Sequence, residues 1–452
     1  MDCNIADIKP MKIIFMGTPE IASDSLISII ELTKNSIADL KCIYTKPEAW
    51  NNKKSQYIKS PVNIIGDKYN IPVRTPKTVK NNQEEIDFIV NIKPDLIIVV
   101  AYGLILPKNI LDIPLYGTIN LHPSILPDLR GPSPIHYALL ENLKYTGISI
   151  MALDEGMDTG PLIAQMKTPV GKDEYFEELY GRLSKIGAYV LSDVIKTLAL
   201  IHSMENICLD EESKKIYTYA SPQSASMLYQ KDCGQNLTIT DKIDNEIKKI
   251  NFSKDKPDLI YSKIRTFSGS DPAYFIFEKK TIKVIRANLI VIKGQFENCN
   301  ENLSKNNSKA IQFKSKHNYC EFLDEDLNNN NILYKKLLSE LSSDNIGMQL
   351  SEKKIETNNG NRNNNHCDNH CDNHCDNHCD DDNALNAENK YNPELIYKPG
   401  TVVIADKSGL VISTLEKGVY LKLLELKPES KKAMNYIDFI NGLRIKFGIM
   451  LQ

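Results

Sequence analysis

The chain has 452 residues, a net charge of −3 and a hydrophobic fraction of 42%, enough for buried cores in about three domains. Its longest apolar run, residues 96–106, has 11 residues, whereas a membrane-spanning helix needs about 20. The first ten residues contain two aspartates and no apolar core, unlike a secretory or transit signal. We therefore expect a cytoplasmic protein without membrane spans.

Residues 11–203 are predicted to form one α/β domain, preceded by a short N-terminal extension over residues 1–10. Runs rich in Ile, Val and Leu alternate with amphipathic stretches, which is typical of a doubly wound, mostly parallel, Rossmann-like sheet. The predicted strands cover residues 12–16, 38–45, 96–101, 117–121, 147–153 and 162–170. The predicted helices cover residues 20–32, 61–69, 82–92, 134–142 and 174–199.

A polar linker over residues 204–222 separates this domain from a second one. The second domain is predicted to begin at residues 223–293, with a helix at 257–266 and a strand-turn-strand at 273–292. Short alternating strands resume in residues 390–452. These two pieces predict one C-terminal all-β, barrel-like domain that is interrupted by an insert.

The insert, residues 294–389, contains 23 Asn among 96 residues, with 17 acidic and 9 basic residues. Such low-complexity sequence buries too little apolar surface to offset chain entropy, so we expect disorder. Because the insert holds an excess of eight acidic residues and the whole chain carries −3, the remainder carries about +5. Four tandem copies of Asn-His-Cys-Asp, residues 365–380, contain possible metal ligands, but they resemble a repeat expansion, and we predict no metal site.

Two segments carry residues suited to chemistry. In the segment 117–134, a predicted strand ends at Asn120 and His122, which period-two alternation places on the same side of the sheet. In the segment 153–165, acidic residues and glycines form a loop that is able to return Asp158 or Asp154 toward His122. The carboxyl ends of parallel strands face the ligand crevice, so these groups are expected to converge there.

Asparagine, histidine and aspartate together suit acyl transfer to an amine. The carboxamide can donate to the oxyanion of a tetrahedral intermediate, the imidazole can move a proton, and the carboxylate can orient the imidazole. No activated Ser or Cys lies next to them, so a covalent intermediate is not implied. The same residue types are common in turns, so spacing alone leaves a structural role open.

Both segments resemble the 10-formyltetrahydrofolate-dependent formyltransferase family. The shared pattern is Asn-x-His-x-Ser-x-x-Pro, here Asn120–Pro127, followed by an Asp-x-Gly-x-Asp-x-Gly loop, here Asp154–Gly160. The resemblance is strongest to members that formylate methionyl initiator tRNA, and it covers nearly all of residues 11–293 and 397–447. Supporting strings occur at residues 14–20, 99–107, 218–220, 399–401 and 431–434.

The resemblance implies a catalytic trio of Asn120, His122 and Asp158. It implies that 10-formyltetrahydrofolate is the formyl donor and that no metal takes part. The implied folate-binding residues are Tyr102, Gly103, Leu104, Ser124, Ile125, Leu126 and Pro127. The implied partner is initiator methionyl-tRNA, and we expect the chain to be a monomer.

The loop after the second predicted strand departs from the family pattern, because it is basic but contains no arginine. Lysine serves phosphate as a point charge without the bidentate fork of arginine. A solvated loop is the alternative interpretation, and Trp50 there suits either base stacking or packing. The lysines expected to contact tRNA are Lys46, Lys53, Lys54, Lys59, Lys431 and Lys432, the last two within a cationic C-terminal set with Lys417, Lys422 and Lys427.

Two other functions remain open from the sequence. One is a small-molecule formyltransferase of the same family, acting on glycinamide ribonucleotide or an amino-sugar. The other is a non-enzymatic RNA-binding relic of the fold. The second domain and the cationic segment argue against the first, and the intact trio argues against the second.

Overall fold

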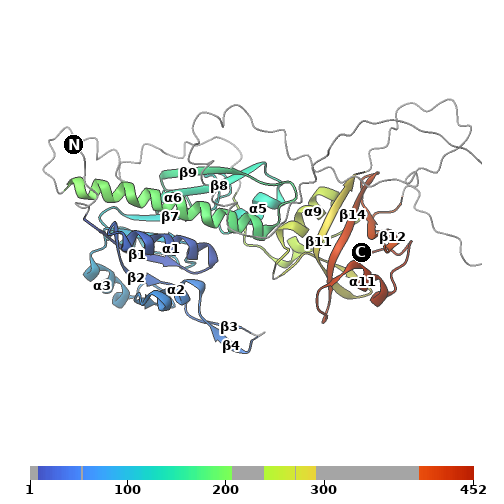
Figure 1. The fold of residues 1–452 in the computed structure, drawn as a ribbon, viewed down its shortest axis with the longest axis horizontal. Helices are drawn as coiled ribbons and strands as arrows, with labels where there is room; N and C mark the ends of the chain where they lie inside the picture. Colours follow the sequence, from blue (N-terminus) through green and yellow to red (C-terminus); the bar gives the residue numbers. More distant parts are fainter. Residues whose placement is uncertain (1–8, 52–53, 206–238, 270, 292–396, 452) are drawn as a thin grey trace, which may run out of the picture. The chain divides into compact units, whose positions relative to one another are not determined.

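The computed structural model describes residues 9–51, 54–205, 239–269, 271–291 and 397–451 (Figure 1). The predicted insert with its repeats, and nearly all of the predicted linker, lie outside the described residues. The N-terminal elements are β1 (Met11–Gly17), α1 (Glu20–Lys34), β2 (Ala38–Tyr44), β3 (Ala49–Asn51), β4 (Gln56–Ile58), α2 (Pro61–Tyr69), β5 (Val73–Arg74), α3 (Gln83–Ile92), β6 (Leu96–Val100), α4 (Lys108–Leu111), β7 (Thr118–His122), α5 (Pro134–Leu140), β8 (Tyr145–Ala152), β9 (Leu162–Pro169) and α6 (Phe176–Glu205).

A seven-stranded sheet in the order β5-β2-β1-β6-β7-β8-β9 forms the centre of the N-terminal part. The five strands from β5 to β7 are parallel, and β8 runs antiparallel to both β7 and β9. β6, whose sequence is LIIVV, is buried along its whole length. Such continuous apolar strands are expected where helices cover both faces of a parallel sheet. The prediction of a mostly parallel, Rossmann-like sheet is therefore confirmed.

The two faces of this sheet bury alternate residues of each strand. On one face, Ile14 and Met16 of β1 join a cluster with Ile89 of α3. On the other face, Gly17 lies close to Phe15 of its own strand and to Ala22 of α1. α1 therefore covers this side of β1. α6, the long green helix in Figure 1, contacts Leu121 of β7 through Gly187. β7 consequently points Leu121 at α6 and its neighbours Asn120 and His122 away from it.

α6 is the one helix in the described ranges that is long and apolar enough, by length and composition, to cross a membrane. Of its most apolar 18-residue window, 61% is buried inside the protein. A helix packed in this way on a sheet has the burial of a core helix.

A polar segment after β2, which the sequence suggests is a loop, contains a short antiparallel hairpin of β3 and β4. Trp50 and Tyr57 face each other across it, with ring centroids 5.2 Å apart. Both rings are largely exposed, at 54% for Trp50 and 65% for Tyr57. The hairpin thus presents an aromatic pair to solvent beside the carboxyl edge of the main sheet.

The C-terminal part is built around a six-stranded antiparallel sheet. Its central pair joins β11 and β14, which lie on opposite sides of the predicted insert in sequence. This pairing confirms a second region, built on an antiparallel sheet, that the insert interrupts; it also contains three helices within the described residues. Its elements are α8 (Asn245–Lys248), α9 (Pro257–Thr266), β10 (Tyr274–Phe277), β11 (Lys280–Val291), β12 (Val402–Asp406), β13 (Gly409–Ser413), β14 (Val419–Pro428), β15 (Met434–Asn435) and α11 (Tyr436–Leu443).

Candidate active site

His122 and Asp158 lie together at the carboxyl end of β7. Nδ1 of His122 is 3.6 Å from Oδ2 of Asp158, and the side chains are only 5% and 15% exposed. Nε2 of His122 lies 3.0 Å from the carbonyl oxygen of Leu129. Because a carbonyl only accepts, Nε2 must carry the proton, which leaves Nδ1 of the neutral ring bare and facing the carboxylate.

Burial sets the charge of this imidazole. It lowers the pKa of His122 below the ordinary value of 6.5, because the charged ring loses water, while the Asp158 carboxylate and the Leu129 carbonyl oppose that shift. His122 is thus neutral at pH 7. A neutral ring with a bare Nδ1 beside a carboxylate is able to accept a proton.

The two acidic residues of the loop after β8 have different positions. Asp158, with a φ of +53°, turns its Oδ2 toward the main chain and accepts a 2.8 Å hydrogen bond from Gly131 N–H. Asp154 instead accepts hydrogen bonds from Thr159 and Gly156 inside its own loop. Of the two carboxylates left open by the sequence, the structure brings Asp158 to His122 and uses Asp154 to hold the loop.

Asn120 lies two residues before His122, on the same side of β7. Its backbone pairs with Val99 of β6 on one side and Met151 of β8 on the other. The residue is partly exposed, and its carboxamide makes no hydrogen bond within the described part of the chain. Asn120 is therefore an amide donor near the end of β7, on the same face of the strand as His122.

The loop Ser124–Pro127 is fixed by two polar residues that sequence reasoning did not identify. The Ser149 hydroxyl donates to Ser124 O at 2.7 Å and accepts from Leu126 N–H at 3.1 Å. Gln165 donates from Nε2 to Leu126 O at 2.9 Å. The Leu126–Pro127 peptide bond is cis. The available sequence signal was a serine between the isoleucines Ile148 and Ile150 of β8. In the structure this serine is fully buried.

The other segment expected to bind folate, Tyr102–Leu104, follows β6 at the same sheet edge. Tyr102 is buried in the core cluster beside α3, and burial raises the pKa of its hydroxyl above the ordinary value. Gly103 has a φ of +76° and lies against Lys46, while Leu104 packs at the margin of the cluster. The structure therefore places Lys46, which is predicted to contact tRNA, against Gly103, which is predicted to contact folate.

The remaining lysines expected at tRNA are spread over two elements. Lys54 is exposed at the turn of the hairpin, and Lys53 lies outside the described residues. Lys59 forms a 2.6 Å ion pair with Asp67, so its charge is already partnered. Lys431 and Lys432 are exposed in the turn between β14 and β15.

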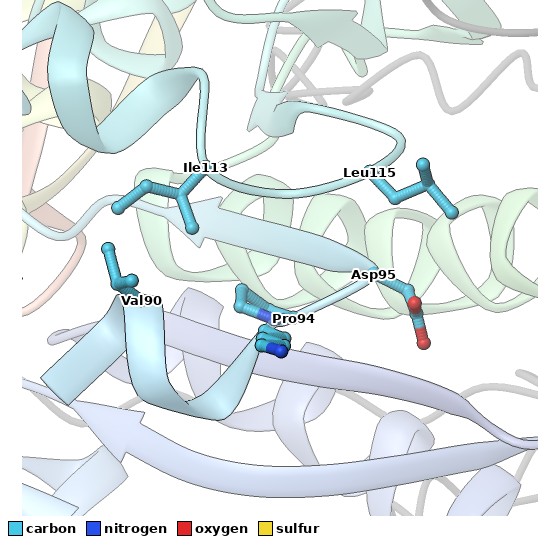
Figure 2. A pocket seen from close by; sticks show the side chains of 6 residues that line it. Val90, Pro94, Asp95, Ile113 and Leu115 are labelled. Carbon is cyan, nitrogen blue, oxygen red and sulfur yellow. The ribbon is translucent and has the colours of Figure 1, made fainter.

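A separate cavity of about 390 Å³ lies at the opposite edge of the sheet (Figure 2). It is lined by Val90, Lys93, Pro94, Asp95, Ile113 and Leu115. Asp95 immediately precedes β6, so the cavity is at the amino end of the strands and away from His122. Within the described ranges, no group of three or more His, Cys, Asp or Glu residues is arranged to hold a metal ion.

Comparison with known proteins identifies the family. The formyl transferase model matches residues 11–195, and the model of the formyl transferase C-terminal domain matches residues 377–444. Methionyl-tRNA formyltransferase of Wolbachia pipientis subsp. Culex pipiens (strain wPip) is 40% identical over 225 residues, covering 49% of this chain and 73% of that protein. Methionyl-tRNA formyltransferase of Rickettsia bellii (strain RML369-C) is 34% identical over 277 residues, covering 61% and 81%.

Among solved structures, phosphoribosylglycinamide formyltransferase from Bacillus halodurans aligns with 41% of this chain and 94% of its own. The identity is 21% and the TM-score 0.36, so this likeness does not bear on the substrate. The two family models and the two methionyl-tRNA formyltransferases together cover both parts of the chain. The chain therefore belongs to the formyl transferase family, in the group of the methionyl-tRNA formyltransferases.

Proposed function

We propose that this chain transfers the formyl group of 10-formyltetrahydrofolate to the α-amine of methionine esterified to initiator tRNA. The observation that supports it most directly is the 3.6 Å approach of His122 Nδ1 to Asp158 Oδ2, with Asn120 on the same face of β7 as His122. Relatives that carry this activity in their names align with 49% and 61% of the chain, and the model of the formyl transferase C-terminal domain matches residues 377–444.

In the reaction, the neutral amine attacks the formyl carbon, and a C–N bond forms as the formyl oxygen becomes an oxyanion. Asn120 is the free donor at the strand end, so we assign it to the oxyanion; losing one such donor costs about 3–4 kcal/mol of barrier. His122 has its Nε2–H committed to Leu129, whereas its bare Nδ1 faces Asp158. We therefore assign the His122 and Asp158 pair to the amine proton.

The intermediate then collapses. The oxyanion re-forms the carbonyl, the bond from the formyl carbon to N10 of the folate breaks, and N10 leaves with a proton. The proton that His122 took from the amine is available for this step. No residue becomes covalently attached to the formyl group, which agrees with the lack of a nucleophile beside Asn120 and His122.

The donor is proposed to bind between the loops that follow β6 and β7. The first loop contributes Tyr102, Gly103 and Leu104. The second is Ser124–Pro127, which Ser149 and Gln165 hold in one position. Preorganisation of this kind limits the ordering cost when a small molecule binds.

The acceptor is proposed to approach over the β3–β4 hairpin. Exposed Trp50 and Tyr57 offer faces for base stacking, and Lys46, Lys53 and Lys54 offer cations for phosphate. Lys59 is the weakest of these candidates, because Asp67 already neutralises it. Lys431 and Lys432 would add long-range attraction from the C-terminal sheet. A cytoplasmic monomer remains a prediction.

The test is a formylation assay of the purified full-length chain with 10-formyltetrahydrofolate. Charged initiator tRNA, charged elongator methionine tRNA and glycinamide ribonucleotide are offered in parallel. We expect the initiator tRNA to be formylated at least a hundredfold faster than the ribonucleotide. A preference for the ribonucleotide would favour the small-molecule alternative, and no transfer to any acceptor would disprove enzymatic activity.

A further inference from the structure

The segment between β7 and α5 contacts both His122 and Asp158. The carbonyl oxygen of Leu129 lies 3.0 Å from Nε2 of His122, and the N–H of Gly131 donates to Oδ2 of Asp158 at 2.8 Å. We call residues 129–133 the bridging segment. Because these two contacts come from nearly adjacent peptide groups, the position of the bridging segment sets the orientation of the imidazole and of the carboxylate together.

The backbone of the bridging segment has a conformation that needs support from outside. Leu129 has a φ of +58° and Gly131 has a φ of +107°. A left-handed backbone at a leucine is uncommon, and it persists only where the surrounding contacts hold it. The contacts that hold this segment therefore also hold the imidazole and the carboxylate.

Thr240, from the C-terminal part of the chain, provides several of these contacts. Its N–H donates to Arg130 O at 2.7 Å. Its hydroxyl donates to the same oxygen at 3.1 Å and accepts from Ser133 N–H at 3.1 Å, and the side chain is buried. A Cβ on Gly131 would lie 2.6 Å from Thr240 O, so the close approach of the two backbones requires glycine there.

Thr240 is itself tied to the C-terminal sheet. Ile243 and Ile247, which follow it, pack against the hydrophobic core of that region. Ile250 N–H then donates to the carbonyl oxygen of Tyr274 in β10 at 2.7 Å. A continuous set of contacts therefore runs from the C-terminal sheet through Thr240 to the bridging segment.

We propose that Thr240 is a positioning residue for formyl transfer, through which the C-terminal part of the chain holds His122 and Asp158 in their working geometry. The inference rests on the proposed function and gives the C-terminal part a role in the chemical step, separate from any role in binding tRNA. A displacement of about 1 Å at a reacting group can lower a rate about a hundredfold. We therefore expect loss of the Thr240 hydroxyl to act on kcat more than on the Michaelis constants.

The experiment compares Thr240→Val, which keeps the shape of the side chain and removes its hydroxyl, with Thr240→Ser, which keeps the hydroxyl. Thr414→Val is the matched control. The Thr414 hydroxyl is also in a buried residue of the C-terminal part, donates to Val419 O at 2.7 Å and accepts from Glu416 N–H at 3.4 Å. Both of its partners lie in its own turn. For each variant, kcat, the Michaelis constants of tRNA and folate, and the melting temperature are measured.

We expect Thr240→Val to lower kcat about tenfold or more, with both Michaelis constants within about twofold of wild type. Thr240→Ser should restore most of kcat. Thr414→Val should lower the melting temperature as Thr240→Val does and leave kcat at the wild-type value. An unchanged kcat in Thr240→Val, or an equal loss in Thr414→Val, would overturn the proposal. A raised tRNA constant with unchanged kcat would overturn it in favour of a role in acceptor binding.

A second measurement needs no substrate. Nitrogen NMR spectra of the chain with isotope-labelled histidine distinguish a protonated Nε2 from a bare Nδ1 in the His122 ring. In Thr240→Val the two ring signals should move toward each other, because the Leu129 carbonyl no longer fixes one tautomer. In Thr414→Val they should stay at their wild-type positions. If Thr240→Val leaves both signals unmoved, the proposal is overturned.

The same spectra separate this inference from the proposed function. If the wild-type chain formylates no acceptor, the proposed function fails by itself, and the His122 signals alone decide on the role of Thr240. If Thr240→Val does not fold, Gly131→Ala tests the contact from the other side, because its methyl group would press against Thr240 O. We expect the same fall in kcat and the same movement of the His122 signals. A Gly131→Ala variant that matches wild type in both would overturn the proposal.

Discussion

Nδ1 of His122 and Oδ2 of Asp158 are 3.6 Å apart, although a loop, a helix and a strand separate the two residues in sequence. The distance exceeds a hydrogen bond, as expected for a bare ring nitrogen that faces a carboxylate. A proton taken up by the ring would be shared with that carboxylate. We therefore expect both residues to be needed for proton transfer.

Replacing His122 should abolish most turnover. We expect His122→Ala to lower kcat at least a hundredfold, because the proton acceptor for the attacking amine is lost. His202→Ala is the matched control, since His202 is equally buried at 4% but lies near Asp95 at the far edge of the sheet. Steady-state formylation of tRNA measures both. Equal losses in the two variants would reduce His122 to a structural role.

The pH dependence of kcat should show an acid limb below pH 6.5. Burial lowers the pKa of His122, so the ring loses its ability to accept a proton only as the pH falls through that lowered value. Asp158→Asn removes the charge that raises this pKa, so the limb should move to still lower pH. The plateau should also drop by about 10²–10⁴-fold. An acid limb that stays in place in Asp158→Asn would contradict the coupling of the two groups.

Removing the Ser149 hydroxyl should weaken folate binding. Ser149→Val leaves Leu126 N–H and Ser124 O without this partner, at a cost of about 1–3 kcal/mol for a buried unsatisfied group. We expect the folate Michaelis constant to rise about tenfold and the tRNA constant to stay within twofold. Thr146→Val on the same strand is the control, because within the described residues its buried hydroxyl has no partner. A comparable folate effect in that control would argue against a specific role of Ser149.

The buried carboxylate of Glu85 should contribute strongly to stability. Arg74 donates to both of its oxygens, at 2.6 and 2.8 Å, and the Tyr44 hydroxyl donates to one at 2.8 Å. Glu85→Ala should lower the free energy of unfolding by about 3–5 kcal/mol, since it removes the buried partner of Arg74 and leaves the Tyr44 hydroxyl without its acceptor. Glu84→Ala removes an 81% exposed partner of the same arginine and should cost at most about 1 kcal/mol. Thermal melts followed by circular dichroism should separate the two variants clearly.

The insert should be dispensable for catalysis. β11 ends at Val291 and pairs with β14 from the other side of the insert, so the described sheet already forms from the flanking pieces. Replacement of residues 294–389 by a short linker should leave kcat/KM for tRNA within threefold. A large loss in a deletion variant that melts at the parent's temperature would instead give the insert a direct function.

The main sheet was predictable because its strands carry a local signal. β1 and β6 are short and rich in apolar residues, and a recognisable proline-rich segment follows β7. The β3–β4 hairpin was not predicted, because each strand has three residues and both are mostly exposed. Strands of that kind have no burial pattern for a sequence to encode.

The site was predictable in its residues but not in its contacts. The choice between Asp154 and Asp158 depends on one left-handed backbone turn at Asp158, which the sequence leaves open. The support from Ser149 and Gln165 depends on cross-strand register between β8 and β9. The contact of Lys46 with Gly103 depends on how loops from three strands pack, and no local pattern encodes that arrangement.

The pairing of β11 with β14 also affects the order of events during synthesis. β11 leaves the ribosome well before its partner, because residues 292–418 must be translated first. At about 5–20 residues per second, this delay is roughly 6–25 seconds. Throughout that interval one long edge of the nascent strand remains open to wrong partners, and a chaperone that covers it would raise the yield of native protein.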